Sequence, residues 1–273
     1  MIKNHRQRLF VHVLSTIMIL CLLLFLGKYL SDDHLVSSFA KKDLVPSWQH
    51  PFGTDWMGRD MLVRTIKGVR ISLAVGFIGA VLGAGIATIL GVMAGVGSSK
   101  IDEFIVWLVD LFMGMPHLIF IILISFMVGG GIKGVVLGVG LTHWPILTRL
   151  VRNEVRTMSS SEYIAISRNL GKSRLFIIVR HILPHLLPQI MVGFLLLFPH
   201  AIMHEAAITF LGFGLSVQMP SVGLILAEAV KYISVGKWWL AVCPGLLLVL
   251  IVKSFDNIGE ECRILSNPFS ANE

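Results

Sequence analysis

The sequence predicts an all-α integral membrane protein with about six transmembrane helices. Hydrophobic residues make up 55% of the 273 residues and charged residues only 14%, whereas about a quarter of a typical soluble protein is charged. Apolar stretches of the roughly 20 residues that a helix needs to cross a ~30 Å hydrocarbon core recur along the chain. The net charge of +7 does not indicate a nucleic-acid partner, because membrane proteins retain lysine and arginine on their cytoplasmic side.

Six stretches meet the length requirement for a span. The first follows a basic segment, as the apolar region of a signal peptide does, but it is too long and lacks a cleavage site with small residues, so we expect a retained helix. The expected spans are residues 9–30, 71–97, 101–128, 132–150, 187–213 and 238–257.

These spans divide the chain into an N-terminal tail with the first helix (1–30), an extracytoplasmic loop (31–70), a five-helix core (71–258) and a cytoplasmic C-terminal tail (259–273). The core contains a polar cytoplasmic loop, residues 151–186. Basic residues near the N-terminus and in this polar loop place both in the cytoplasm by the positive-inside rule. The basic residues of the first loop run against the rule. The arrangement with both termini in the cytoplasm, in a multi-pass protein of the inner (cytoplasmic) membrane, is still favoured.

Glycines are concentrated in the second expected span. The pairs Gly79/Gly83 and Gly91/Gly95 have the spacing that lets helix backbones approach closely in lipid. Two interpretations remain open at this stage: packing within the chain and an interface with another subunit.

The polar loop contains Gly171-Lys172-Ser173, the ending of a nucleotide-binding P-loop. The first glycine of that motif should stand at position 166, which is isoleucine. A helix–turn–helix explains the glycine better. Ser159 to Glu162 fit a capping box before a helix of about 160–170 that ends at Gly171. Ser173 then caps a second helix through about 182, which Pro184 and Pro188 close before the fifth span.

The same loop resembles the coupling loop of ABC-importer permeases, in the branch that includes dipeptide, oligopeptide and nickel systems. The resemblance lies in Glu162, Tyr163, Ala165, Arg168, Leu170 and Gly171, followed by Arg180, His181, Leu183 and Pro184. The Glu-Ala-Ala core of the family is replaced by Ala165, Ile166 and Ser167. Further stretches that resemble the branch are residues 50–76, 110–118, 208–233 and 238–263.

The resemblance implies the permease fold of type I ABC importers and a transport role without catalysis. It implies that the coupling loop docks on a separate ATP-binding subunit. The implied partners are a second homologous permease, two ATP-binding subunits, an extracytoplasmic substrate-binding protein and membrane lipid. We expect no cofactor on this chain, because ATP and magnesium would be used by the partner subunits. The coupling residues it implies are Glu162, Tyr163, Ala165, Arg168, Leu170, Gly171, Arg180 and Pro184.

Polar residues within the fifth expected span are candidates for the cargo path, because ionisable groups inside a membrane usually face a cavity or a partner. His200 and His204 are spaced i, i+4 and therefore project from one helix face. Two imidazoles suit a borderline divalent cation, and the pair resembles nickel permeases of the branch. Glu205, His143 and also His117 are further candidates.

The sequence thus favours nickel or a small metal chelate as cargo, bound transiently by His200 and His204, with di- or oligopeptides as the alternative. The histidines could equally serve only to hydrogen-bond neighbouring helices. An intramembrane metalloenzyme is disfavoured because Glu205 follows the second histidine instead of lying between the two. A secondary transporter is disfavoured because no internal repeat is visible and the docking loop would be unexplained.

Overall fold

The computed structural model describes residues 36–216 and 219–266, together with individual positions between 11 and 30. Most of the first expected span and the end of the C-terminal tail therefore lie outside the described residues. Within the described part every regular element is a helix, and the only strand-like pairing is an isolated bridge between Thr54 and Asp60. The elements are η2 (Phe39–Lys41), α2 (Met61–Val96), α3 (Ser99–Met113), α4 (His117–Met127), α5 (Gly131–Gly140), α6 (Trp144–Ser159), α7 (Glu162–Asn169), α8 (Arg174–Ile177), η3 (Ile178–Ile182), α9 (Leu183–Phe210), α10 (Val222–Ile233) and α11 (Trp239–Ser266).

Four helical stretches in the described part are long and apolar enough to cross a membrane. A fifth span is present if the bent pair α3–α4 is one. This confirms the predicted fold class of an all-α membrane protein. The four stretches are Met61–Val96, Gly131–Ser159, Arg174–Phe210 and Trp239–Ile264.

The third expected span, residues 101–128, is not one straight helix. Helices α3 and α4 meet at an angle of 97°, and Pro116 stands directly before α4. A proline cannot donate the backbone hydrogen bond that would continue α3, and it disfavours helical conformation in the residue before it. The fourth span is also interrupted, between Gly140 and Trp144, just before Pro145.

Helix α2 begins at Met61, well before the expected residue 71. The side chain of Asp60 accepts a hydrogen bond from the amide of Val63 at 3.0 Å and caps the helix. This is the typical way in which an aspartate satisfies one free N–H group at a helix start. The polar loop before α2 is therefore shorter than the sequence indicated.

The glycines of α2 pack against other helices of the same chain. A Cβ atom added at Gly91 would lie 2.7 Å from Val151 Cβ, and one added at Gly95 would lie 2.4 Å from Val155 Cγ1. Both valines belong to α6, so the absence of a side chain lets α2 and α6 approach closely. Of the two interpretations left open by the sequence, packing within the chain explains these positions.

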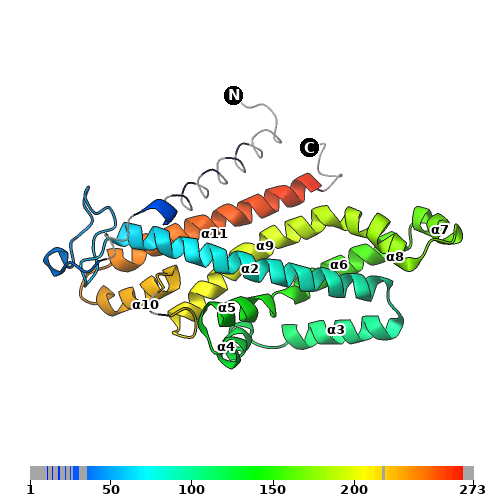
Figure 1. The fold of residues 1–273 in the computed structure, drawn as a ribbon, viewed down its shortest axis with the longest axis horizontal. Helices are drawn as coiled ribbons and strands as arrows, with labels where there is room; N and C mark the ends of the chain where they lie inside the picture. Colours follow the sequence, from blue (N-terminus) through cyan, green and yellow to red (C-terminus); the bar gives the residue numbers. More distant parts are fainter. Residues whose placement is uncertain are drawn as a thin grey trace.

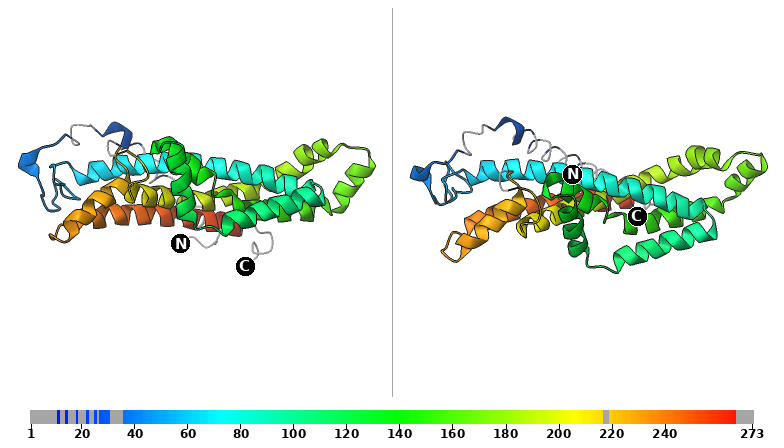
Figure 2. Two further views of the ribbon diagram at one scale, coloured as in Figure 1. Left: turned by 90° about the horizontal axis from the view of Figure 1, so that it is seen from below. Right: turned by 60° about the horizontal axis from the view of Figure 1, so that its bottom comes forward.

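Different elements form the two ends of the helical bundle. Figures 1 and 2 show α7 and α8 at one end of the long axis, and the loop before α2 together with α10 at the opposite end. We call the first the coupling end (residues 160–182) and the second the loop end (residues 36–64 and 222–233).

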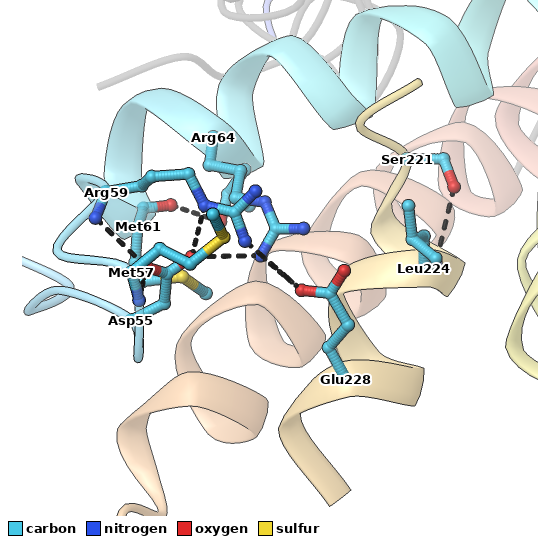
Figure 3. Close-up of polar contacts among 9 residues, drawn as sticks. Asp55, Met57, Arg59, Met61, Arg64, Ser221, Leu224 and Glu228 are labelled. Atoms are coloured by element: carbon cyan, nitrogen blue, oxygen red, sulfur yellow. Dashed lines mark hydrogen bonds and ion pairs between the residues drawn. The ribbon is translucent and has the colours of Figure 1, made fainter. Parts of the chain in front are cut away.

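A buried charge network holds the loop end together (Figure 3). The Asp55 carboxylate accepts hydrogen bonds from Arg59 Nε at 2.7 Å and from Arg64 Nη1 at 3.2 Å. Arg64 also lies 2.7 Å from the carboxylate of Glu228 on α10. Asp55 is 2% exposed and Arg64 4% exposed, so the charges are satisfied by one another and tie the loop to α2 and α10.

Candidate functional site

The coupling end carries one short helix, α7, that is buried on one side only. Ile164 is fully buried, and Ser167 is also buried. The side chains between and beyond them point outward: Leu170 keeps 72% of its surface exposed and Ile166 keeps 59%. Exposed apolar side chains grouped on one face are typical of an interaction site. All eight predicted coupling residues are exposed, namely Glu162, Tyr163, Ala165, Arg168, Leu170, Gly171, Arg180 and Pro184.

The turn after α7 forms as predicted. Gly171 has a φ of +75°, in the left-handed region that favours glycine. Ser173 accepts a hydrogen bond from the amide of Phe176 at 3.2 Å and caps α8.

The predicted capping box at residues 159–162 is wrong. Helix α6 continues through Ser159, which leaves Ser161 as the residue before α7. Its hydroxyl donates to the carbonyl of Met158 at 2.5 Å and accepts no backbone N–H of α7. Glu162 is the first residue of α7, where a negative charge is favourable beside the helix N-terminus.

Pro184 and Pro188 do not end a helix, contrary to the prediction. Helix α8 continues through the π-helical turn η3 into α9, and Arg174–Phe210 is one membrane-length stretch. A proline ring clashes with the carbonyl four residues before it in an α-helix. For Pro184 that residue is Arg180, which lies in the wider π-helical turn. At the coupling end, α8 is therefore the start of a continuous stretch that is long and apolar enough to cross a membrane.

His181 joins α7 to this long helix. Its Nε2 lies 3.3 Å from the hydroxyl of Ser167, and its ring makes edge contacts with Tyr163 and Phe176 at centroid distances of 6.0 and 5.8 Å. Because His181 belongs to η3, these contacts connect α7 to the segment that leads into α9. The sequence motif included His181, but its role was missed because the contact depends on how α7 folds back.

Several arginines in the polar loop and just before it are paired within the chain. Arg152 donates to Asp102 of α3, with Nη2 at 2.7 Å, and Arg156 pairs with the same carboxylate. Arg149 pairs with Asp110. These contacts fix α3 to α6. Three other basic residues, in α7 and in the segment that follows it, line a cavity of about 320 Å³ between α7, α8 and the end of α2. Those basic residues are Arg168, Lys172 and Arg174.

A second cavity, also of about 320 Å³, contains a group of histidines. His117 is the first residue of α4, His143 stands directly before α6, and His204 lies on α9. Their ring centroids are 4.6 to 5.0 Å apart, and one nitrogen from each lies within 4.8 Å of the others. We call these three residues the histidine triad. The other residues that line the cavity are Phe112, Met113, Met115, Thr142, Pro145, Ile146, Leu197 and His200.

The predicted cargo residues do not all border the histidine cavity. His200 lines the cavity but is exposed and lies outside the triad. Glu205 is fully buried and accepts a hydrogen bond from the hydroxyl of Thr209 at 3.0 Å. It is not among the residues that line the histidine cavity. The pair His200/His204 as metal ligands and Glu205 as a path residue stay predictions.

His117 and His143 come to His204 only through the tertiary structure. Each of the two residues stands at a break between helices: His117 directly after Pro116, and His143 two residues before Pro145. A signal was present in the sequence, because each histidine stands next to or near a proline within an apolar stretch. Their meeting point was not predictable without knowing that the two breaks lie at the same level of the bundle.

The chain matches a family model described as "Binding-protein-dependent transport system inner membrane component" over residues 87–260. It is 30% identical over 264 residues to the dipeptide transport system permease protein DppC of Bacillus subtilis (strain 168), a match that covers 96% of this chain and 82% of that protein. The identity is 36% over 224 residues to a DppC protein of Alkalihalophilus pseudofirmus, with coverages of 82% and 73%. The oligopeptide permease OppC of B. subtilis is 28% identical, with coverages of 94% and 84%.

Among solved structures, a chain of the methionine ABC transporter MetNI in an inward-facing conformation resembles this fold. Its TM-score is 0.62 at 19% identity, and the match covers 76% of this chain and 98% of that chain. At this identity the likeness supports the fold alone.

The chain therefore belongs to the family of inner-membrane components of binding-protein-dependent transport systems. It is a multi-pass membrane permease of the ABC-importer class, as its sequence motifs predicted. The relatives named above are peptide permeases, so they do not support the nickel branch that we favoured from the sequence.

Proposed function

We propose that this chain forms half of the translocation path of an ATP-driven importer for di- or oligopeptides. Support comes from relatives of 28% to 36% identity that are named as dipeptide or oligopeptide permeases. The alternative drawn from the sequence is thus better supported than the uptake of nickel by itself.

The other half of the path is a second homologous permease. Two ATP-binding subunits bind ATP and magnesium on the cytoplasmic side, and a substrate-binding protein delivers cargo from outside. Both termini and the coupling end lie in the cytoplasm. The family description supports a binding-protein partner, and the one-sided burial of α7 supports a partner at the coupling end.

The observation that carries the mechanism is the continuity of the helical stretch Arg174–Phe210. The exposed face of α7 binds the ATP-binding subunit, and closure of two such subunits displaces α7. His181 passes the displacement to η3 and α9. Because α9 packs between α2 and α11, its tilt changes the path between the two permeases. Such rocking around a central site gives alternating access.

Uptake of a labelled dipeptide by cells that contain the complete importer tests the proposal. We expect uptake that requires this chain and is saturated by unlabelled di- and oligopeptides. Purified complex in lipid should hydrolyse ATP faster when the binding protein and peptide are added. An assembled complex that imports no peptide would contradict the proposed cargo.

A further inference from the structure

We propose that the histidine triad binds a divalent transition-metal ion that enters as a chelate with a small anionic ligand. The ion belongs to the borderline class, such as Co²⁺, Ni²⁺ or Zn²⁺, for which imidazole is a preferred ligand. This inference rests on the proposed permease function and narrows its cargo to peptide-like ligands that carry a metal. It also replaces the predicted pair His200/His204 by a site with three donors.

The three donor atoms are close to the spacing that a metal requires. One nitrogen of each imidazole lies within 4.8 Å of the other two. Nitrogens bound at about 2.1 Å around a tetrahedral ion lie about 3.4 Å apart. Small ring rotations of His117 and His204 close this difference, because both side chains border the cavity.

His143 is already oriented as a metal ligand. Its Nδ1 lies 2.8 Å from the carbonyl oxygen of Val139, which can only accept a hydrogen bond. Nδ1 therefore carries the proton, and the lone pair remains on Nε2. That second nitrogen is buried and has no hydrogen-bond partner. A buried polar atom without a partner costs free energy. An imidazole held by a backbone carbonyl on one nitrogen is a recurrent arrangement of metal-binding histidines.

The absence of carboxylates from the described lining of the cavity favours a metal bound to an anionic ligand over a free cation. Among the residues that the structure describes, no aspartate or glutamate lines this cavity. A free divalent cation on three neutral imidazoles would keep its full charge in a largely apolar site within the membrane, which is energetically costly. A ligand with two carboxylates removes that charge. The metal therefore enters with its own anionic ligand, and the triad completes the coordination.

The position of the triad links metal binding to the moving parts. His117 and His143 stand at the two helix breaks, and His204 lies on α9. The stretch that carries His204 begins at the coupling end. A metal shared by the triad holds both breaks against α9, and the tilt of α9 separates the donors and releases the cargo.

Equilibrium dialysis of radiolabelled nickel against the purified intact complex tests the triad. The probe is the complex of Ni²⁺ with iminodiacetate, because this dianionic ligand neutralises the metal and leaves three coordination positions for imidazoles. Single substitutions His117→Ala, His143→Ala and His204→Ala should each weaken binding by roughly tenfold or more, as loss of a ligand exceeds loss of a supporting contact. His185→Ala, at the exposed start of α9, is the matched control and should bind like wild type. His200→Ala tests the other ligand predicted from the sequence, on the wall of the same cavity.

The inference is overturned if the wild-type complex does not bind the probe, or if the triple alanine variant binds it unchanged. It is also overturned if His200→Ala alone abolishes binding. Dipeptide uptake measured on the same membranes separates the two proposals. Intact peptide uptake without nickel binding removes only the metal assignment, whereas an assembled complex that imports neither cargo removes the proposed function as well.

Discussion

The loop end and the coupling end of this permease differ in how their side chains are accommodated. At the loop end the polar groups of an irregular segment are satisfied within the chain, through Asp55, Arg64 and Glu228. At the coupling end, α7 buries Ile164 and leaves Ile166 and Leu170 exposed. The central charges of the first end are thus paired within the chain, while Phe39 and Trp48 on its loop are exposed. The second end exposes apolar side chains on one face of a short helix, as interaction sites do.

The difference predicts that the two ends contribute unequally to the stability of the chain. A buried charge network is destabilised strongly when one member is lost, because the remaining charges stay buried without partners. A short exposed helix contributes little to the stability of the chain itself. Substitutions at the loop end should therefore lower stability, and substitutions at the coupling end should lower transport with little change in stability.

The largest effect is expected for Asp55→Ala. This carboxylate accepts from both arginines and from the amides of Met57 and Arg59, and its loss leaves Arg64 buried with one partner fewer. We expect a destabilisation of about 3–5 kcal/mol, measured as thermal unfolding of the purified complex. Glu260→Gln is the control, because its pair with Arg263 is exposed on both sides and its loss should change the unfolding temperature little. Equal effects of the two variants would contradict a network centred on Asp55.

The next largest effect is expected for Leu170→Asp on the exposed face of α7. The new charge has no partner in an apolar interface, so binding of the ATP-binding subunit should weaken by roughly tenfold or more, or about 1.4 kcal/mol. Copurification of that subunit and dipeptide uptake measure the loss. Val235→Asp, at an equally exposed valine in the turn after α10, is the matched control. A comparable loss in the control would show that α7 is not the docking site.

A smaller effect is expected for His181→Ala, which removes the contact between α7 and η3. The complex should assemble normally and hydrolyse ATP, while uptake per ATP falls several-fold because α7 moves without α9. His185→Ala is the control, since that side chain is largely exposed and lies 3.8 Å from Glu154. Unchanged coupling in His181→Ala would place the transmission elsewhere.

The smallest effect is expected for Ser173→Ala, which removes the hydroxyl that caps α8. Loss of such a cap costs about 1 kcal/mol. Because α8 continues into η3, the effect should be confined to faster hydrogen exchange at the amides near Phe176. Protection that is lost along the whole of α9 would show that the cap controls the long helix.

The local features of this chain were predictable from sequence, and the tertiary ones were not. Hydropathy located the spans of the described residues, because a backbone in lipid must satisfy its own hydrogen bonds, which leaves helices as the solution. The turn at Gly171 and the cap at Ser173 depend only on neighbouring residues. Both were predicted correctly for that reason.

Three features required the structure. The 97° bend before Pro116 interrupts a stretch that is apolar on both sides, so hydropathy shows no boundary. Pro184 was expected to end a helix, but the π-helical turn around Arg180 accommodates it. The triad joins residues from α4, the break before α6, and α9. The i, i+4 rule finds His200 and His204 because it describes a single helix, and it cannot find partners on others.

The central claim is that the exposed face of α7 contacts the ATP-binding subunit. Photo-crosslinking from Leu170, replaced by benzoyl-phenylalanine in the intact importer, tests it most directly. We predict a covalent adduct with the ATP-binding subunit from Leu170 and none from the same probe at Val235. An intact importer in which Leu170 forms no such adduct, or in which both positions form it equally, would contradict the account.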